Sequence, residues 1–347
     1  MGPVNQEEIA PKVVSNELTK NNGIWFGEEG HYWSNLNIDE NRAFLQDLTR
    51  LNAKDLVKKH FPQHFDVIFS PKRAGGLIFL DPRPGDVVVD AGCMWGALTI
   101  PLAKAGCRVI GIDQTLESLL LLRQRALDEN LSNVELVCSD MNKTAFNDSS
   151  FDKIIANGVL EWIPATFSIE VKKYHGEKAK EPNSDSKRPD ELQKGFLSKI
   201  YRGLKPGGSL YLAIENRYNI FYFLGVPDPH CNLRFITFMP RPVQNLISRV
   251  ALGRPYVNWI YSPEGLKRLL ISVGFRDVDM HYAFPDYRFP EYILTDVGMG
   301  IYQPFLYASR KNNVKKVVTY GIEKVIYQKL KLSIFAPSII AIARKGG

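Results

Sequence analysis

Asp90-Ala91-Gly92-Cys93-Met94-Trp95-Gly96 follows Val87-Val88-Val89, a run of β-branched residues that predicts a buried strand. Ala97 to Ala105 then has the composition of a helix. Where a parallel strand turns into a helix, unpaired backbone amides are exposed at the strand tip, and ligands bind there. Gly92 permits a sharp turn, and Gly96 permits close packing of the helix on the strand. The stretch favours a nucleotide-type site, although a purely structural turn fits the same residues.

Short apolar runs alternate with helical stretches from Asp86 onward, which is the pattern of βα units. We expect an α/β fold with a doubly wound, mostly parallel, seven-stranded sheet and helices on both faces. The expected strands are Val87–Val89, Arg108–Ile112, Val134–Cys138, Phe151–Ala156, Ser209–Ile214, Val278–Tyr282 and Ile339–Arg344. The other expected helices are Leu116–Glu129, Gln193–Leu204 and one that Ser262-Pro263-Glu264 caps and that runs through Val273.

Composition shifts divide the chain into four parts. Residues 1–81 predict a mainly helical extension or lid, whose aromatic clusters Ile24-Trp25-Phe26 and Tyr32-Trp33 either pack on the core or contact a ligand. Residues 82–216 form the nucleotide-binding core, with a solvated insertion at 171–191. Residues 217–261 are rich in aromatics, Pro and Arg and are expected to cover the substrate, and residues 262–347 complete the core.

The chain has 347 residues, and its formal charge of +7 is mild for this length. Basic residues cluster only at Lys172–Lys180 and Lys311–Lys316, so a nucleic-acid partner is not favoured. A solvated basic surface explains this charge, and so does an anionic partner such as a nucleotide-sugar, a membrane surface or RNA.

Cysteine spacing and hydropathy indicate a reducing compartment. Cys93, Cys107, Cys138 and Cys231 include no pair with zinc-knuckle spacing, and we expect neither disulfides nor a bound metal. Residues 1–20 contain no apolar leader, and no stretch is long enough to span a bilayer. We expect a cytoplasmic protein, for which peripheral membrane contact stays open.

A second acidic residue narrows the class of ligand that this site is expected to bind. Asp113 ends the second expected strand 23 residues after Asp90, where a carboxylate binds both ribose hydroxyls of an adenosine, although it equally fits a helix cap. The nicotinamide fingerprint Gly-x-Gly-x-x-Gly does not fit, because the spacing from Gly92 to Gly96 is four and an acid precedes Gly92 by two residues. A charged amino-acid nucleoside fits better than a pyrophosphate, with Asp90 near its amino group.

These residues resemble the class I (Rossmann-like) S-adenosylmethionine-dependent methyltransferases, whose first motif is acid-x-Gly-x-Gly-x-Gly. Asp90, Gly92 and Gly96 match, and Met94 replaces the middle glycine. Asn157–Ile163 resembles the family's fourth-strand tip, and Leu204–Gly208 resembles the turn before its fifth strand. The resemblance implies S-adenosylmethionine as cofactor, with Asp113 on the ribose and Asp140 and Met141 at the adenine. The implied cofactor contacts are Asp90, Gly92, Cys93, Met94, Gly96, Asp113, Gln114, Asp140, Met141 and Asn157.

Ala213–Tyr218, Phe223–His230 and Phe284–Pro290 are similar to methyltransferases associated with glycosyltransferases in bacterial surface-polysaccharide assembly. This narrower resemblance implies O-methylation of a sugar hydroxyl.

Methylation of a hydroxyl is helped by a base, and the candidates are Glu161, Glu215 and His230. Each has a structural alternative: Glu161 as a helix-start acid, Glu215 as a partner of Arg217, and His230 as a surface loop residue. Relatives often have a histidine at the position of Trp162. Because this chain has no histidine there, we expect no base at that position. The acceptor-binding candidates are Asn216, Arg217, Tyr218, Tyr287 and Arg288.

Two other classes remain as alternatives. An RNA or protein methyltransferase is one, but the Asn-Pro-Pro-Tyr and Pro-Cys signatures are missing from the fourth-strand tip. A non-catalytic scaffold that binds the cofactor is the other, and Met94 is the residue that supports it.

Overall fold

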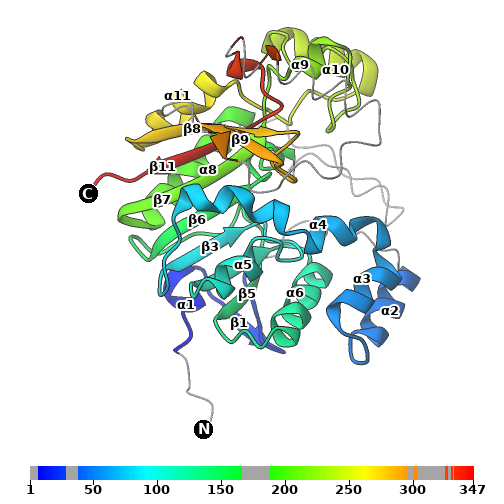
Figure 1. Ribbon diagram of the computed structural model, residues 1–347, viewed down its shortest axis with the longest axis vertical. Helices are drawn as coiled ribbons and strands as arrows, with labels where there is room; N and C mark the ends of the chain where they lie inside the picture. The colour runs from blue at the N-terminus through cyan, green and yellow to red at the C-terminus, as the bar shows by residue number, and fades with distance from the viewer. Residues whose placement is uncertain are drawn as a thin grey trace.

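A computed structural model describes residues 7–28, 38–165, 188–295, 301–302, 325–326, 330 and 332–347. In this part of the chain, eleven strands form one mixed sheet in the order β1-β2-β5-β4-β3-β6-β7-β11-β8-β9-β10 (Figure 1). The strands are β1 (Thr19–Asn21), β2 (Ile24–Phe26), β3 (Val87–Ala91), β4 (Arg108–Asp113), β5 (Val134–Cys138), β6 (Phe151–Asn157), β7 (Leu204–Glu215), β8 (Val278–Phe284), β9 (Tyr292–Thr295), β10 (Ile301–Tyr302) and β11 (Ser338–Arg344).

The seven expected strands are all present, but they are not the whole sheet. They are β5, β4, β3, β6, β7, β11 and β8, which lie side by side in that order. The first five are parallel to one another, while β11 is antiparallel to β7 and β8. The expected count of seven is wrong for the whole sheet, because short strands extend it at both edges.

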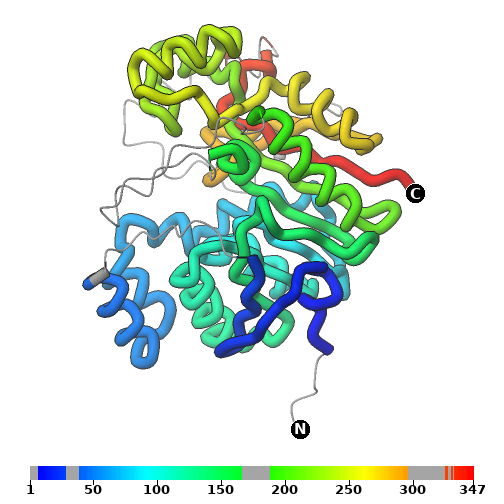
Figure 2. The backbone as a smooth tube through the Cα atoms, turned by 180° about the vertical axis from the view of Figure 1, so that it is seen from behind, coloured from blue at the N-terminus to red at the C-terminus, as the bar shows by residue number. Residues whose placement is uncertain are grey.

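Helices cover both faces of the sheet, as expected for an α/β fold. The α-helices are α1 (Ala10–Val13), α2 (Ile38–Asp47), α3 (Ala53–His60), α4 (Phe65–Phe69), α5 (Thr99–Lys104), α6 (Leu116–Asp128), α8 (Pro189–Gly203), α9 (Ile220–Phe223), α10 (Arg241–Leu252) and α11 (Pro263–Val273). The 3-10 helices are η1 (Pro62–His64), η2 (Pro71–Leu80), η3 (Leu160–Trp162) and η6 (Ser333–Phe335). Helices α1, α8 and α11 lie on one face of the sheet, and η2, α5 and α6 lie on the other (Figures 1 and 2).

Alternation along the strands builds these two cores, since successive side chains of a strand point to opposite faces. Val89 and Ala91 of β3 join the core under α8, whereas Val88 joins the core under η2 and α5. All three side chains are fully buried. Burial on both faces explains why β3 is a continuous apolar run in the sequence.

The N-terminal extension is less purely helical than expected. Ile24-Trp25-Phe26 is β2, which pairs with β5 in parallel and with β1 as a hairpin. Ile24 is fully buried, and Trp25 Nε1 donates to Glu135 at 3.2 Å. This aromatic cluster therefore packs on the core. Tyr32-Trp33, most of the 171–191 insertion and both basic clusters lie outside the described residues.

Two element boundaries differ from expectation for local reasons. Helix α5 begins at Thr99 rather than Ala97, because Gly96 has a φ of +74° and the next residues still belong to the turn. Strand β7 begins at Leu204 rather than Ser209. Phe151 pairs with Leu204 and Lys153 with Ser209, so the Lys-Pro-Gly-Gly turn is a bulge within the strand.

All four cysteines are free thiols, of which Cys93 and Cys107 are buried. Among the described helices, none is long and apolar enough to cross a membrane.

Candidate functional site

The carboxyl ends of five neighbouring parallel strands bring the expected site residues to one edge of the sheet. Asp90 and Asp113 lie at the ends of β3 and β4, Asn157 ends β6, and Glu215 ends β7. Asp140 follows β5 by two residues. Ligands of open α/β sheets bind at this edge.

The turn after β3 takes a backbone shape that favours glycine at three positions. Gly92, Met94 and Gly96 all have positive φ, of +71°, +44° and +74°. A Cβ at Gly92 would lie 2.6 Å from Val159 Cγ2, and one at Gly96 would lie 2.0 Å from Leu122 Cδ1. Met94 thus adopts the left-handed conformation in which the related motif has a glycine.

Asp113 holds this turn against β4. Its carboxylate accepts from the backbone amides of Met94 and Thr115, each at 2.9 Å. Burial raises the pKa of Asp113 above its ordinary value. Both structural and ligand-binding roles are open to it, because each carboxylate oxygen retains a further lone pair.

Asp90 is buried beneath the same turn and accepts from Thr99 Oγ1 at 2.6 Å. Burial raises the pKa of Asp90 to about 6. Asp90, Gly92, Cys93, Met94 and Asn157 line one pocket.

Arg73, which sequence analysis missed, also lines this pocket together with Val67 and Trp95. It lies on η2, and its guanidinium makes no hydrogen bond or ion pair with any described residue. Burial lowers the pKa of Arg73, and the charge of Asp90 opposes that shift. No motif identifies Arg73 in the sequence, because its place at the site depends on how η2 packs.

Two buried oxygens at this edge fit the expected cofactor. Gln114 Oε1 and Asn157 Oδ1 have no hydrogen-bond partner among the described residues. S-adenosylmethionine carries complementary donors in its amino group, ribose hydroxyls and adenine amine. Asp140 accepts from the Asn142 amide at 2.9 Å, and Met141 beside it is buried.

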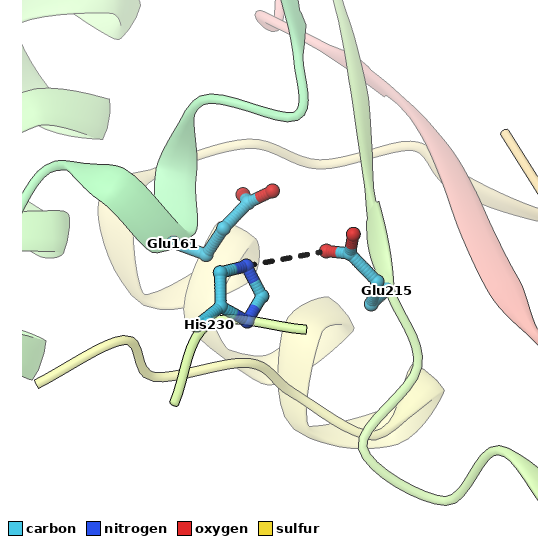
Figure 3. A group of neighbouring side chains, drawn as sticks. All are labelled: Glu161, Glu215 and His230. Carbon is cyan, nitrogen blue, oxygen red and sulfur yellow. Dashed lines mark ion pairs between the residues drawn. The ribbon is translucent and has the colours of Figure 1, made fainter. Parts of the chain in front are cut away.

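The three candidate bases come together from separate segments (Figure 3). Glu161 lies on η3, Glu215 ends β7, and His230 lies in the loop between α9 and α10. One ligand atom from each lies within 4.8 Å of the other two. His230 Nε2 is 3.9 Å from Glu215 Oε2.

The structural alternatives for these three residues do not hold. Glu161 lies in the first turn of η3, but it is fully buried and neither carboxylate oxygen has a hydrogen-bond partner among the described residues, so its side chain caps no backbone amide there. Glu215 accepts from Tyr287 Oη at 3.4 Å rather than pairing with Arg217. The side chain of His230 is 2% exposed, so His230 is not a surface residue.

Burial and charge act together on this cluster. Burial, and then the charge of Glu215, raise the pKa of Glu161 well above its ordinary value. Burial lowers the pKa of His230, but its hydrogen bond to Asp228 and the charge of Glu215 outweigh that effect and raise it overall.

Tyr287 connects the pocket to the cluster. A Cβ at Gly158 would lie 2.3 Å from Tyr287 Oη, so this tyrosine packs directly on the backbone of the β6 tip. The same tip carries Asn157 of the pocket and leads into Glu161. Trp162 makes an edge contact with His230, at 5.1 Å between ring centroids.

Two of the five acceptor-binding candidates donate hydrogen bonds to backbone carbonyls. The Asn216 amide donates to Ile334 and Ala336 carbonyls at 2.7 and 2.8 Å, and its oxygen accepts from Tyr218 N. Arg217 donates to the Thr237 and Met239 carbonyls. Asn216 and Arg217 therefore support the chain around the site, and their contact with an acceptor stays a prediction.

Arg288 is exposed and lies 3.5 Å from Asp286. Tyr218, whose ring lies 5.9 Å from the Arg217 guanidinium, is half-buried. Of the five, Tyr287 is the residue in contact with the candidate bases.

Comparison with known proteins gives a family match over part of the chain. Residues 88–171 match the model described as "Methyltransferase domain". The mitochondrial ubiquinone biosynthesis O-methyltransferase of Rattus norvegicus is 26% identical over 148 residues, 42% of this chain and 35% of the rat protein. The carboxy-S-adenosyl-L-methionine synthase of Shewanella oneidensis is 24% identical over 171 residues, 48% of this chain and 58% of that protein.

The matched part thus spans between a third and three fifths of these relatives' length. Among solved structures, the phosphoethanolamine N-methyltransferase 2 of Haemonchus contortus with S-adenosylhomocysteine is 16% identical, with a TM-score of 0.47. The alignment covers 88% of this chain and 60% of that one.

Proposed function

We propose that this chain, whose residues 88–171 match a methyltransferase domain, is an S-adenosylmethionine-dependent methyltransferase that methylates the hydroxyl of a small-molecule acceptor, most specifically a sugar. The observation that carries the proposal is the cluster of Glu161, Glu215 and His230 beside the cofactor pocket. The β6 tip, residues 157–161, contributes to both.

The residues at the carboxyl edge of the parallel strands are the ones that would bind the cofactor. Asp113 and Gln114 would bind the ribose, Asp140 and Met141 the adenine, and Asp90 the amino group. Arg73 and Asn157 complete the lining at the methionine end. When bound, S-adenosylmethionine supplies a methyl group on a positively charged sulfur. The protein's part is to hold the acceptor oxygen in line with that group, which itself accounts for much of the rate.

A hydroxyl acceptor fits the chemistry of the cluster. Two carboxylates and an imidazole can accept a hydroxyl's hydrogen, and Tyr287 Oη offers a donor to the acceptor. The rat relative is named as an O-methyltransferase, which supports oxygen as the methylated atom. The resemblance to polysaccharide-assembly methyltransferases supports a saccharide or nucleotide-sugar.

Calorimetry tests the cofactor site. We expect the full chain to bind S-adenosylmethionine and Asp113→Ala to bind at least about tenfold more weakly, because a charge-assisted hydrogen bond is worth about 1.5–3 kcal/mol. Asp148→Ala is the control, since its exposed carboxylate pairs only with Arg202 at the surface. Absence of binding by the wild-type chain, or unchanged binding in Asp113→Ala, contradicts the proposal.

Methyl-labelled cofactor tests the acceptor. We expect label in nucleotide-sugar or glycolipid fractions, and loss of labelling in Glu215→Gln. Label that appears only in RNA or protein fractions would replace the sugar with one of those acceptors. Cofactor binding without transfer to any fraction would support a scaffold.

A further inference from the structure

We propose that Glu161, Glu215 and His230 bind a divalent metal cation, which in turn binds the acceptor's hydroxyl oxygen. Binding of the cation stands on the geometry of the cluster alone. Its role in catalysis rests on the proposed function. Ligand spacing along the sequence predicts no metal, because these three ligands are spread over 70 residues, from 161 to 230.

The separation of the three donors suits a cation. Divalent cations bind carboxylate oxygen and imidazole nitrogen at about 2.0–2.3 Å, so two ligands of one ion lie about 2.8–3.8 Å apart when adjacent and up to about 4.6 Å apart when opposite. The three donor atoms lie within 4.8 Å of one another, and His230 Nε2 lies 3.9 Å from Glu215 Oε2. His230 Nε2 and Glu215 Oε2 are therefore too far apart to hydrogen-bond, and the three donor atoms are close enough to converge on one ion.

Glu161 provides the second, independent observation. Its side chain is fully buried, points into the cluster (Figure 3), and neither oxygen has a hydrogen-bond partner among the described residues. A buried carboxylate without partners costs several kcal/mol. Glu215 Oε2 likewise lacks a partner.

Neighbouring groups hold two of the ligands as they do in metal sites. Asp228 Oδ1 lies 3.3 Å from His230 Nδ1, which leaves Nε2 directed at the cluster. Tyr287 Oη donates to Glu215 Oε1 at 3.4 Å, so Oε2 is the free oxygen. Ligating imidazoles and carboxylates are characteristically oriented by neighbouring carboxylates and hydrogen-bond donors.

Two carboxylates and one imidazole suit Mg²⁺ or Mn²⁺ and leave coordination positions open. A hydroxyl bound there loses its proton more readily, because the cation acts as a Lewis acid. The acceptor's O–H bond breaks and the proton passes to water. The oxygen then forms its bond to the methyl carbon while the carbon–sulfur bond breaks and its electron pair stays on sulfur.

Mn²⁺ titration of the metal-free full chain, followed by electron paramagnetic resonance, tests the site without cofactor or acceptor. We expect one Mn²⁺ per chain in the wild type and at least a 100-fold loss of affinity in Glu161→Gln, which keeps the shape of the side chain. We also expect a nitrogen coupling on the bound Mn²⁺ that disappears in His230→Gln. Glu264→Gln, at an exposed glutamate of α11, is the matched control and should bind like wild type.

Substitution of Asp228, which positions His230, distinguishes an organised metal site from a chance grouping of ligands. Asp228→Asn does not touch the cation, so we expect about 10–100-fold weaker Mn²⁺ binding rather than complete loss. S-adenosylmethionine binding in the presence of a chelator verifies that each variant is folded. Failure of the wild type to bind Mn²⁺ at millimolar concentration, or equal affinity in Glu161→Gln, overturns the inference even when cofactor binding is intact. Mn²⁺ binding without cofactor binding overturns the proposed function instead.

Discussion

Gly96 lies where the first motif's turn meets α6, and there is no room at this residue for a side chain. In Gly96→Ala the new Cβ would lie 2.0 Å from Leu122 Cδ1, and Leu122 is fully buried and cannot swing away. Overpacking and the positive φ together should lower the free energy of unfolding by about 2–4 kcal/mol, measured by urea denaturation. Gly207→Ala is the control, because Gly207 has a φ of +77° and open space around it. We expect it to lose only about 1–2 kcal/mol, and equal losses would contradict the packing argument.

Asp90 makes the stability of the cofactor-free protein depend on pH. Its pKa is about 6 in the folded chain, because of burial, against about 3.9 when unfolded. The folded state therefore binds more protons between these values, and stability falls as pH rises from about 4 to 6. The loss is about 3 kcal/mol in total. Asp90→Asn removes this penalty, so its stability relative to wild type should rise by that amount between pH 4 and pH 7. A pH-independent difference between the two unfolding curves would refute it.

At the scale of elements, the sequence predicts the N-terminal cap at which α11 begins. Ser262 Oγ accepts from the Gly265 amide at 3.2 Å, and Pro263 occupies the first turn. Ser262→Ala should lower the free energy of unfolding by about 1 kcal/mol. Ser198→Ala, inside α8, is the comparison, since Ser198 Oγ bonds back to the Lys194 carbonyl and caps nothing. That substitution should leave stability unchanged or slightly higher, because alanine favours helix interiors.

The sequence predicts the elements that have a local sequence pattern and misses those that depend on distant partners. The apolar run Val87–Val89 predicts a buried strand, and Ser262 predicts a helix cap. Strand β2 has three residues and no alternation, and β5 is the strand that holds it at the sheet edge. Arg73 likewise carries no motif. The sequence predicts Glu161, Glu215 and His230 as alternative candidates for a base, but their convergence depends on chain segments far apart in the sequence, which no local pattern encodes.

At the scale of the whole molecule, β11 joins the two halves of the sheet. It pairs with β7 through residues 338–344 and with β8 through residues 338–343. Ile339, Ile340 and Ala341 are fully buried. Deletion of residues 338–347 should abolish cooperative thermal unfolding and expose surface that binds a hydrophobic dye. Deletion of Gly346 and Gly347 alone should leave the unfolding transition in place. A cooperative transition in the longer deletion would show that the halves fold without β11.

The place of β11 also sets an order of events during synthesis. Both of its neighbours, β7 and β8, are made before it, so each waits with an open hydrogen-bonding edge while the chain between them and β11 is translated. The ribosome must release residues 338–344 before this gap can close. A nascent chain stalled before residue 338 would expose two unpaired strand edges, so we expect this protein to need a chaperone until β11 has paired.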